Sequence, residues 1–458
     1  MTDPVHFSAT AMARAVRKKD VSATELVQAH LDRIEAVNPR LNAVVTRCDD
    51  RALAAAAAAD RAVADGDRLG LFHGVPITVK DALDTAGIRT TAGSTGLSDN
   101  VPETNATTVQ RLVDAGAIVV GKTNTPDLTL SYETDNLVFG RTNNPYDLER
   151  SPGGSSGGAA AAIAAGLSAL DLGTDTGGSI RYPSHACGIA GIRPTSGRVP
   201  RTGLCIPFGS PVDAATVVGP MARTVEDLAV ALGVVSGPDG VDPAIVPMPA
   251  GDAFNTPLRR LRVAVYVDDG VMAAEPDVAD ATRAAADVLT AAGAQVVEAR
   301  PPVIDQAADL FNGVFGGDAG QWFRRILDRF GSVEHGFGPA PEGQPPASAY
   351  VESVEALASY QSQMLQWFQD YDLILSPPHA RVALEHGASM DEGLGGAGYL
   401  MAYNLTGWPG AVVRAGRTAA GLPVGVQVVA HPWQDHVALA AALEVERALG
   451  GWQPPALS

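Results

Sequence analysis

Cysteine is scarce in this sequence. It contains only Cys48, Cys187 and Cys205, and an odd number of cysteines at wide spacing argues against a disulfide framework. Such sparse usage is typical of proteins that fold in a reducing compartment. We therefore expect a cytoplasmic protein.

Long apolar runs and targeting signals are also missing. The stretch from Met1 to His6 lacks the basic and apolar segments of a secretory signal. No apolar run free of charge and repeated glycine is long enough to cross a bilayer. We expect no membrane partner.

Basic residues are outnumbered by acidic ones. The chain has 33 Lys and Arg against 51 Asp and Glu, a formal net charge of −18, without any run of basic residues. A phosphate backbone would on average be repelled, so we expect no nucleic-acid partner. The simplest meaning of this acidity is solubility.

What the sequence does contain is enough apolar material for a large core, since 46% of its 458 residues are hydrophobic. Short apolar runs predict strands at 75–79, 117–120, 167–172, 262–267, 295–298, 373–375 and 424–429. Helices are expected at 107–115, 157–165 and 276–292, and loops at 236–260 and 336–348. This alternation predicts an α/β fold, a single large domain whose central twisted, mixed and mainly parallel β-sheet is covered by helices on both faces.

The N-terminal residues 8–65 are expected to be helical. Ser8 and Ser22 are suitable N-cap residues, and Glu25, three positions after Ser22, completes a capping box. This region would wrap the core or contact a second copy of the chain, which would suit a homodimer.

Two glycine-rich loops stand out. The first is Ser151-Pro-Gly-Gly-Ser-Ser-Gly-Gly158, and the second, directly after a predicted strand, is Gly173-Thr-Asp-Thr-Gly-Gly-Ser179. Successive glycines let backbone N–H groups converge on one point. That geometry suits an anion, either a phosphate or a tetrahedral oxyanion.

Three interpretations of these loops compete. Neither loop has the glycine and lysine spacing of the known nucleotide-binding motifs, which disfavours a phosphate site. Gly153 to Gly157 fits the Gly-x-Ser-x-Gly elbow of α/β-hydrolases, and so does the frame centred on Ser156. However, residues 143–152 are polar and broken by proline, whereas that elbow needs a buried strand before it. Taken alone, each loop could equally be a structural turn.

The loops belong to a longer series of motifs. The other blocks are Val79-Lys-Asp81, Gly121-Lys-Thr-Asn124, Cys187-Gly-Ile-Ala-Gly-Ile-Arg-Pro-Thr-Ser-Gly-Arg198, Asn404-Leu-Thr-Gly-Trp-Pro409 and Leu422-Pro-Val-Gly-Val-Gln427. In this order and spacing the chain resembles the amidase signature family. Arg193 and Pro200 stand where that family more often has Lys and Ser, and we expect both to lie outside the chemical centre.

The resemblance implies a catalytic triad without histidine. Ser179 would be the nucleophile, Ser155 the bridging serine behind a cis peptide bond, and Lys80 the terminal base. A serine hydroxyl attacks poorly until a base takes its proton. A lysine can act as that base only when it is neutral, a form that burial favours.

The remaining site residues support this triad. The implied oxyanion hole consists of the backbone amides of Thr176, Gly177, Gly178 and Ser179. The implied supports are Ser156 and Asp175. For the substrate pocket we expect Leu130, Ser131 and Tyr132, together with aromatic residues of segment 311–375. We expect no metal and no other cofactor, and we interpret His431 and His436 as structural.

The resemblance implies an amidase that cleaves the C–N bond of linear amides through an acyl-enzyme. We expect a small neutral aryl or alkyl amide as substrate, with carbamates (urethanes) and esters as related substrates, as in an aryl acylamidase or urethanase. The alternative is the glutaminase subunit of a tRNA-dependent amidotransferase. The acidic charge disfavours that alternative, as does the glycine-rich stretch 395–398, where a carboxylate for a glutamine α-amino group would be expected. A non-catalytic relative with a binding role is a third interpretation, against which the intact triad argues.

The domain organisation follows from the motif positions. Residues 1–70 would form an N-terminal helical wrap, and residues 71–458 the amidase signature catalytic domain. The sequence changes from helix-like to strand-like near residue 74 without a linker. The two parts would therefore pack as one compact unit.

Overall fold

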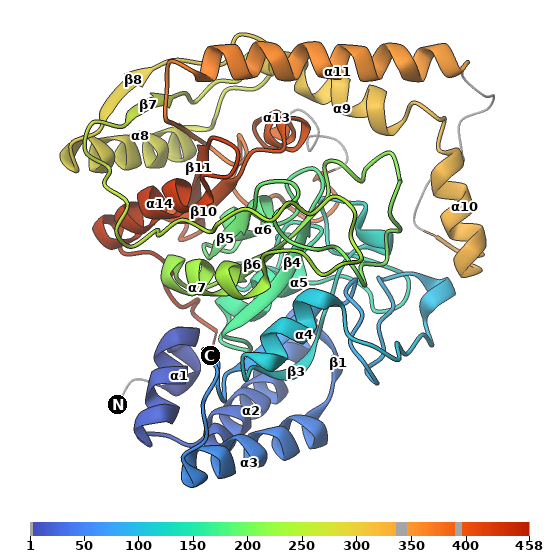
Figure 1. The fold of residues 1–458 in the computed structure, drawn as a ribbon, viewed down its shortest axis with the longest axis vertical. Coiled ribbons are helices and arrows are strands. Elements are labelled where there is room, and N and C mark those ends of the chain that lie inside the picture. The colour runs from blue at the N-terminus through green and yellow to red at the C-terminus, as the bar shows by residue number, and fades with distance from the viewer. Residues whose placement is uncertain (1–2, 336–345, 390–395, 458) are drawn as a thin grey trace.

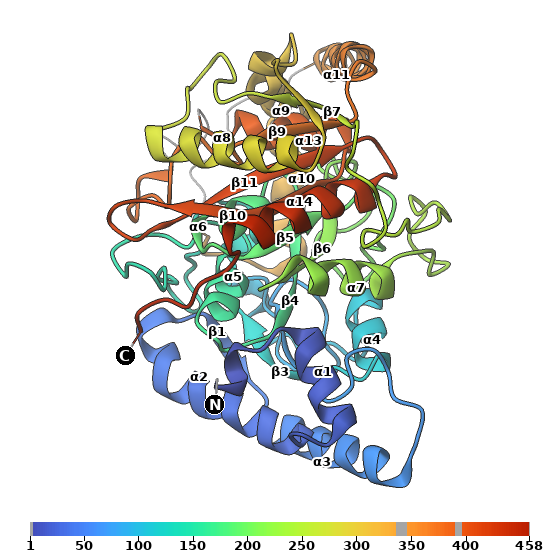
Figure 2. The same cartoon turned by 90° about the vertical axis from the view of Figure 1, so that its left-hand side faces the viewer.

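The fold is described by a computed structural model that covers residues 3–335, 346–389 and 396–457. Most of the predicted loop 336–348 and the glycine at position 395 lie outside these residues. The prediction was wrong for its last two positions, because helix α11 begins at Ala347. Helices α1 to α3 lie at one end of the molecule and α11 at the other (Figures 1 and 2).

Each predicted strand and helix is present close to its predicted range, and the structure adds further strands and helices that were not predicted. Figure 1 labels them. The strands are β1 (Val44–Arg47), β2 (Pro76–Lys80), β3 (Ile118–Thr123), β4 (Leu170–Asp175), β5 (Ala190–Arg193), β6 (Val217–Ala222), β7 (Arg262–Val265), β8 (Gln295–Glu298), β9 (Leu373–Ser376), β10 (Gly410–Arg417) and β11 (Pro423–Ala430). The helices are α1 (Ala9–Lys18), α2 (Ala23–Leu41), α3 (Asp49–Asp65), α4 (Thr107–Asp114), α5 (Gly157–Ala164), α6 (Arg181–Ala186), α7 (Val225–Val235), α8 (Pro276–Ala291), α9 (Ala307–Phe315), α10 (Gln321–Phe330), α11 (Ala347–Phe368), α13 (Gly398–Thr406) and α14 (Asp435–Leu449).

The described strands form two sheets. One is three-stranded in the order β1-β3-β2, and the other is eight-stranded in the order β4-β6-β5-β10-β11-β9-β7-β8. The two sheets meet where β2 lies beside β4, since Thr78 donates from its backbone to Ser168 Oγ (2.9 Å) and from its hydroxyl to Asp171 (2.6 Å). This contact brings the ends of β2 and β4 together.

The prediction of a mixed sheet is confirmed, but the prediction that it is mainly parallel was wrong. In the larger sheet only β7 pairs in parallel, with β8 and β9, while the other neighbouring strands are antiparallel. The parallel strands β7 and β8 are connected by α8, in the predicted order of strand 262–267, helix 276–292 and strand 295–298. Strands β10 and β11 form a hairpin instead, because Thr418 and Leu422 close a short turn between them. The direction of each strand therefore depends on the segment that connects it to its neighbour, and the alternation of strands and helices in the sequence does not specify that segment's path.

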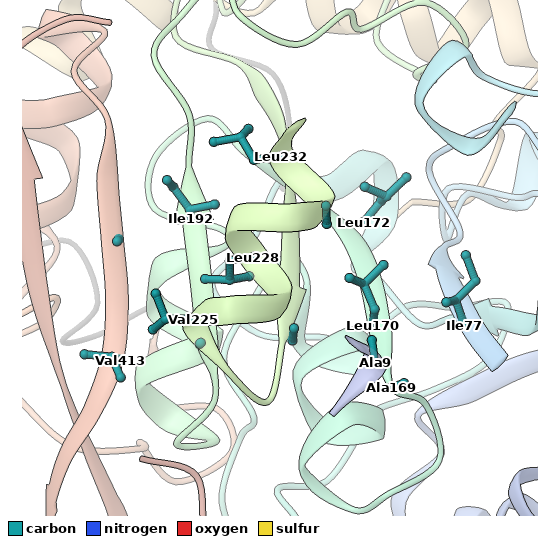
Figure 3. Packing of buried hydrophobic residues seen from close by; sticks show 14 of the residues in the cluster. Ala9, Ile77, Ala169, Leu170, Leu172, Ile192, Val225, Leu228, Leu232 and Val413 are labelled. Atoms are coloured by element: carbon teal, nitrogen blue, oxygen red, sulfur yellow. The ribbon is translucent and has the colours of Figure 1, made fainter. Parts of the chain in front are cut away.

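Helices cover both faces of the larger sheet, as predicted. Along β11 the side chains alternate, so that Val424, Val426 and Val428 join the main hydrophobic cluster with α7, α8 and α14. Val429 points to the opposite face, into a second cluster rich in tyrosine, built on α11 and α13. Figure 3 shows side chains of α7 in the main cluster over the neighbouring strands.

The N-terminal region is helical except for one strand. The predicted caps are confirmed, since Ser8 Oγ accepts from Ala11 N and Ser22 forms the capping box with Glu25. The prediction was wrong for β1, because Asn42 ends α2 in the left-handed conformation and the next residues pair antiparallel with β3. A strand this short is stabilised by its partner rather than by its own propensity.

Candidate active site

Lys80 lies at the end of β2 and is completely buried. Its Nζ donates hydrogen bonds to the hydroxyls of Ser155 (2.7 Å), Ser156 (2.9 Å) and Thr174 (2.7 Å). All three partners are neutral and can either donate or accept. The surroundings therefore accommodate both the protonated and the neutral amine.

Burial lowers the pKa of Lys80 to about 7, and interactions with Cys205, Asp171 and Asp175 offset only part of this effect. A lysine with this pKa is neutral in a large fraction of molecules near neutral pH. This satisfies the condition that a lysine base requires.

The first glycine-rich loop places Ser155 over Lys80. The Gly154–Ser155 peptide bond is cis, as the resemblance implied. A Cβ atom on Gly154 would lie 2.7 Å from the carbonyl oxygen of Ser131, so only glycine allows the loop to approach so closely. The two glycine-rich loops are joined directly, because the amide of Ser156 donates to the carbonyl of Ser179 (3.2 Å).

The second glycine-rich loop carries Ser179 between β4 and α6. Gly178 has a φ of +121°, and a Cβ atom there would lie 2.5 Å from Leu400 Cδ1, so this position requires glycine. Ser179 is 7% exposed and lines a cavity, whereas Ser155 and Lys80 lie behind it. The arrangement presents the Ser179 side chain to a ligand and keeps the lysine away from solvent.

The backbone amides around Ser179 are divided between two uses. The amide of Gly178 donates to Asp175 Oδ1 (2.9 Å), so in this structure it does not point toward the cavity. This differs from the expectation that all four amides form the oxyanion hole. The amides of Thr176, Gly177 and Ser179 donate to no acceptor in the described residues, and these three remain the candidates for an oxyanion hole.

Asp175 stabilises the second glycine-rich loop through hydrogen bonds and ion pairs. Burial alone would raise its pKa, but the guanidinium of Arg181 outweighs this effect and holds the pKa well below the usual range of a carboxyl group. Arg181 Nε donates to Asp175 Oδ2 (3.0 Å), and Asn404 Nδ2 donates to Oδ1 (2.8 Å). Gln427 in turn accepts from Arg181 (2.7 Å). The blocks that contain Asn404 and Gln427 were recognised in the sequence, and Arg181 lies two positions after the second loop, but no role was assigned to any of the three.

Arg193, which we expected outside the chemical centre, contacts Asp175 beside the second glycine-rich loop. Arg193 is completely buried, donates from Nη1 to the backbone oxygen of Asp175 (3.1 Å) and lies 3.8 Å from its carboxylate. Its position two strands away in the sheet, on β5, brings it under the second loop. Thr174, which also contacts Lys80, was likewise part of a recognised motif without an assigned role.

We expect Asp175→Asn to lower the free energy of unfolding by about 3 kcal/mol, because it leaves Arg181 buried without its counter-charge. Urea unfolding of the purified variant measures this change. Asp372→Asn is a matched control, since it removes the carboxylate of an exposed pair with Arg262 (3.0 Å) and should change stability little. Equal losses in both variants would contradict the importance of the buried pair.

A cavity of about 450 Å³ opens in front of Ser179. Leu130, Ser131 and Tyr132 line it, where the sequence predicted a substrate-binding segment. Tyr132 is fixed there because its hydroxyl donates to the carbonyl oxygen of Gly177 (2.8 Å).

The aromatic residues of segment 311–375 have different surroundings. Those that line the cavity are Phe311, Phe315, Trp322 and Phe323, and all but Phe315 also pack against hydrophobic clusters. Those that pack in or against such clusters without lining the cavity are Phe330, Tyr360, Trp367, Phe368 and Tyr371, and Tyr350 is exposed. The sequence showed that aromatic residues gather in this segment, but only their positions on α9, α10 and α11 separate lining from core.

The histidines near the C-terminus lie in ordinary packing environments. His431 stacks on Phe368 with ring centroids 3.9 Å apart, and a Cβ atom on Gly251 would meet the His436 ring. The described residues contain no group of three or more His, Cys, Asp or Glu placed to hold a metal ion. None of the helices described here is long and apolar enough to span a membrane.

Comparison with known proteins agrees with the arrangement of the loops. Residues 25–439 match the family model described as Amidase. The chain belongs to the amidase signature family. The relatives of this amidase include two proteins described as subunits of glutamyl-tRNA(Gln) amidotransferase. That of Chloroflexus aurantiacus is 38% identical over 472 residues and 95% of each chain, and that of Salinispora arenicola is 38% identical over 498 residues and all of each chain.

Solved structures confirm the fold of the amidase. A 6-aminohexanoate cyclic dimer hydrolase superposes with a TM-score of 0.87 at 29% identity over 99% of each chain. A bacterial aryl acylamidase of the amidase signature family gives 0.84 at 27% identity over 96% of each chain. The corresponding glutamyl-tRNA(Gln) amidotransferase subunit from Thermotoga maritima gives 0.82 at 26% identity over 100% of this chain and 99% of that one. The protein is thus an amidase-family C–N hydrolase.

Proposed function

We propose that this amidase hydrolyses neutral aryl or alkyl amides, and related carbamates and esters, through an acyl-enzyme on Ser179. The observation that carries this proposal is the position of Lys80, completely buried against three hydroxyls with a pKa lowered to about 7. A lysine in such surroundings can take a proton at neutral pH and return it.

The reaction would proceed by a relay of hydroxyls. Ser179 Oγ attacks the scissile carbonyl while its proton passes to Ser155, and the Ser155 proton passes to neutral Lys80. The amides of Thr176, Gly177 and Ser179 would stabilise the oxyanion. The proton then returns through Ser155 to the leaving nitrogen, which departs as a neutral amine. Water hydrolyses the acyl-enzyme by the same route.

The cavity favours neutral substrates with apolar substituents. Its described lining combines Leu130, Val212 and Met401 with aromatic side chains. Burying apolar area stabilises a ligand by about 25 cal/mol per Å², while an unpaired charge would have to be desolvated at a cost. Anilides and short alkyl amides fit these surroundings, and a carbamate presents the same carbonyl to the same amides.

A glutaminase subunit is the second candidate, and the curated relatives favour it over the first. Two amidotransferase subunits match essentially the whole chain at 38% identity, a higher identity than that of the aryl acylamidase structure. Bound free glutamine would need a cation for its α-carboxylate. The described lining of the cavity includes neither Lys nor Arg, and the segments 336–345 and 390–395 contain neither. The residue immediately before α13 is Ala397, which offers no carboxylate for the α-amino group of glutamine. The chemistry of the cavity is our reason for ranking the neutral amide first.

A substrate comparison with the purified chain alone tests the ranking. We expect kcat/KM for an acetanilide and for an aryl carbamate to exceed that for glutamine by about tenfold or more, since desolvating an unpaired carboxylate costs at least about 1–2 kcal/mol. Ammonia release measures glutamine turnover, and arylamine absorbance measures the others. A clear preference for glutamine would reverse the order of the two candidates.

A further inference from the structure

One carboxylate stands among the otherwise uncharged side chains that are described as lining the cavity. Asp318 is the single ionisable acid or base, other than tyrosine, among the lining residues that the structure describes. It lies in the turn between α9 and α10 and is half-buried. The amides of Gly320 and Trp322 donate to Oδ1 (3.0 Å) and Oδ2 (2.6 Å). These bonds fix the carboxylate, and since each oxygen can accept more than one donor, it keeps acceptor capacity for a ligand.

Aromatic rings connect this carboxylate with the reacting end of the cavity. Phe311 approaches the oxyanion loop, since a Cβ atom on Gly177 would lie 3.1 Å from Phe311 Cζ. Phe315 lies edge-on to Phe311, with ring centroids 4.1 Å apart. Trp322 continues the wall beside Asp318, to whose side chain it donates its backbone hydrogen bond.

We propose that this end of the cavity binds a cationic group of the amide substrate, a protonated amine or a quaternary ammonium, held by Asp318 and the surrounding aromatic rings. This inference rests on the proposed amide hydrolase function and extends its substrates to amides that carry a cation elsewhere in the molecule. The substituent would lie away from the scissile carbonyl, which itself belongs to a neutral amide.

The lining discriminates by the sign of the charge. Aromatic faces attract cations through the ring quadrupole, and a fixed carboxylate adds a direct counter-charge. A substrate carboxylate would meet Asp318 as a like charge and would have no partner. Arg324 and Arg325 lie on the first turns of α10, and neither lines the cavity. Arg324 donates to the backbone oxygen of Ala319 (3.2 Å). Asp318 thus provides a partner for a cation and not for an anion.

A matched set of substrates tests the proposal. Three anilides have acyl chains of equal length that end in trimethylammonium, tert-butyl or carboxylate. The first two have nearly the same shape and differ in charge. For the unmodified enzyme we expect kcat/KM to favour the ammonium over the tert-butyl compound by about tenfold. The carboxylate compound should be the poorest of the three.

Asp318→Asn is the decisive variant. Its amide oxygen can still accept a hydrogen bond at the start of α10, but its charge is gone. We expect the preference for ammonium over tert-butyl to disappear, because kcat/KM for the ammonium compound should fall to about the value for the tert-butyl compound. Asp328→Asn, on the exposed face of the same helix, should keep the preference. An unchanged preference in Asp318→Asn, or an equal fall for all three compounds, would overturn the proposal and leave Asp318 as a helix cap.

Binding of the cation is measured separately from turnover. Phenyltrimethylammonium should quench the fluorescence of Trp322 in the unmodified enzyme and bind more weakly to Asp318→Asn, with tert-butylbenzene as the neutral control. Loss of this quenching in a Trp322→Phe variant would show that Trp322 is the source of the signal. If none of the anilides is hydrolysed, the proposed function fails, and this titration still decides the inference. Equal binding of the cation to both proteins would refute it.

Discussion

Ser179→Ala abolishes amide hydrolysis without unfolding the protein. This is the expected result because Ser179 Oγ forms the acyl bond in the proposed mechanism, and loss of a serine nucleophile lowers kcat by about 10⁴-fold or more. In the described structure the hydroxyl faces the cavity and makes no hydrogen bond, so its removal leaves no buried group unpaired. The melting temperature should therefore stay close to that of the unmodified enzyme. Steady-state kinetics and thermal unfolding measure the two quantities.

Covalent labelling identifies the nucleophile independently. A fluorophosphonate should label the unmodified enzyme at Ser179 and should not label Ser179→Ala. Ser389→Ala, which removes another hydroxyl from the same cavity lining, should remain fully labelled. Labelling at Ser156 instead would reject this assignment and restore the α/β-hydrolase elbow as an interpretation.

Lys80→Met should lower the turnover of anilides by about 10³-fold, since general acid–base catalysis contributes roughly 10²–10⁴-fold. Methionine fills a similar volume, so the neighbouring loops keep their packing. The loss should be much smaller for a nitrophenyl ester, because its phenolate leaves without taking a proton. Equal losses on both substrates would indicate that Lys80 has a structural role instead.

The pH dependence should report the same lysine. Lys80 accepts a proton only when it is neutral, and its pKa is lowered to about 7. The rate should therefore be highest above pH 7 and should fall as pH drops below that value, approaching about tenfold per pH unit. Asp171 is a second buried group that titrates nearby, because burial raises its pKa to about 6. The rate of an Asp171→Asn variant should still fall as pH drops below 7. If the rate of this variant no longer depended on pH in that range, the titrating group would be Asp171.

The motifs could be recognised from the sequence because their requirements are local. Gly178 has to be glycine for the conformation of its own backbone, and Ser8 and Ser22 cap the helices that directly follow them. A strand ending at Lys80 and a helix following Ser156 were predicted from short apolar and alanine-rich runs, and the structure has both. Propensity, caps and glycine conformations act over a few residues, so the chain itself specifies them.

The direction and pairing of strands could not be obtained in this way. β1 is a strand because β3 lies beside it, and the larger sheet is mostly antiparallel because of how its connections run. Nothing within a short apolar run specifies its neighbour, since pairing is a contact between distant segments.

The chemistry of the site depended on tertiary structure in the same way. The sequence supplied Lys80, but its pKa is set by burial against hydroxyls from residues 75 to 94 positions further along the chain. The Gly178 amide donates to Asp175 and so does not point toward the oxyanion hole. Arg193, which lies on another strand, also donates a hydrogen bond to Asp175. Asp318 meets the rings near Ser179 because residues of α9, α10 and the second glycine-rich loop line the same cavity. Desolvation and charge interactions depend on distance in space, and that distance is decided by the packing of the whole chain.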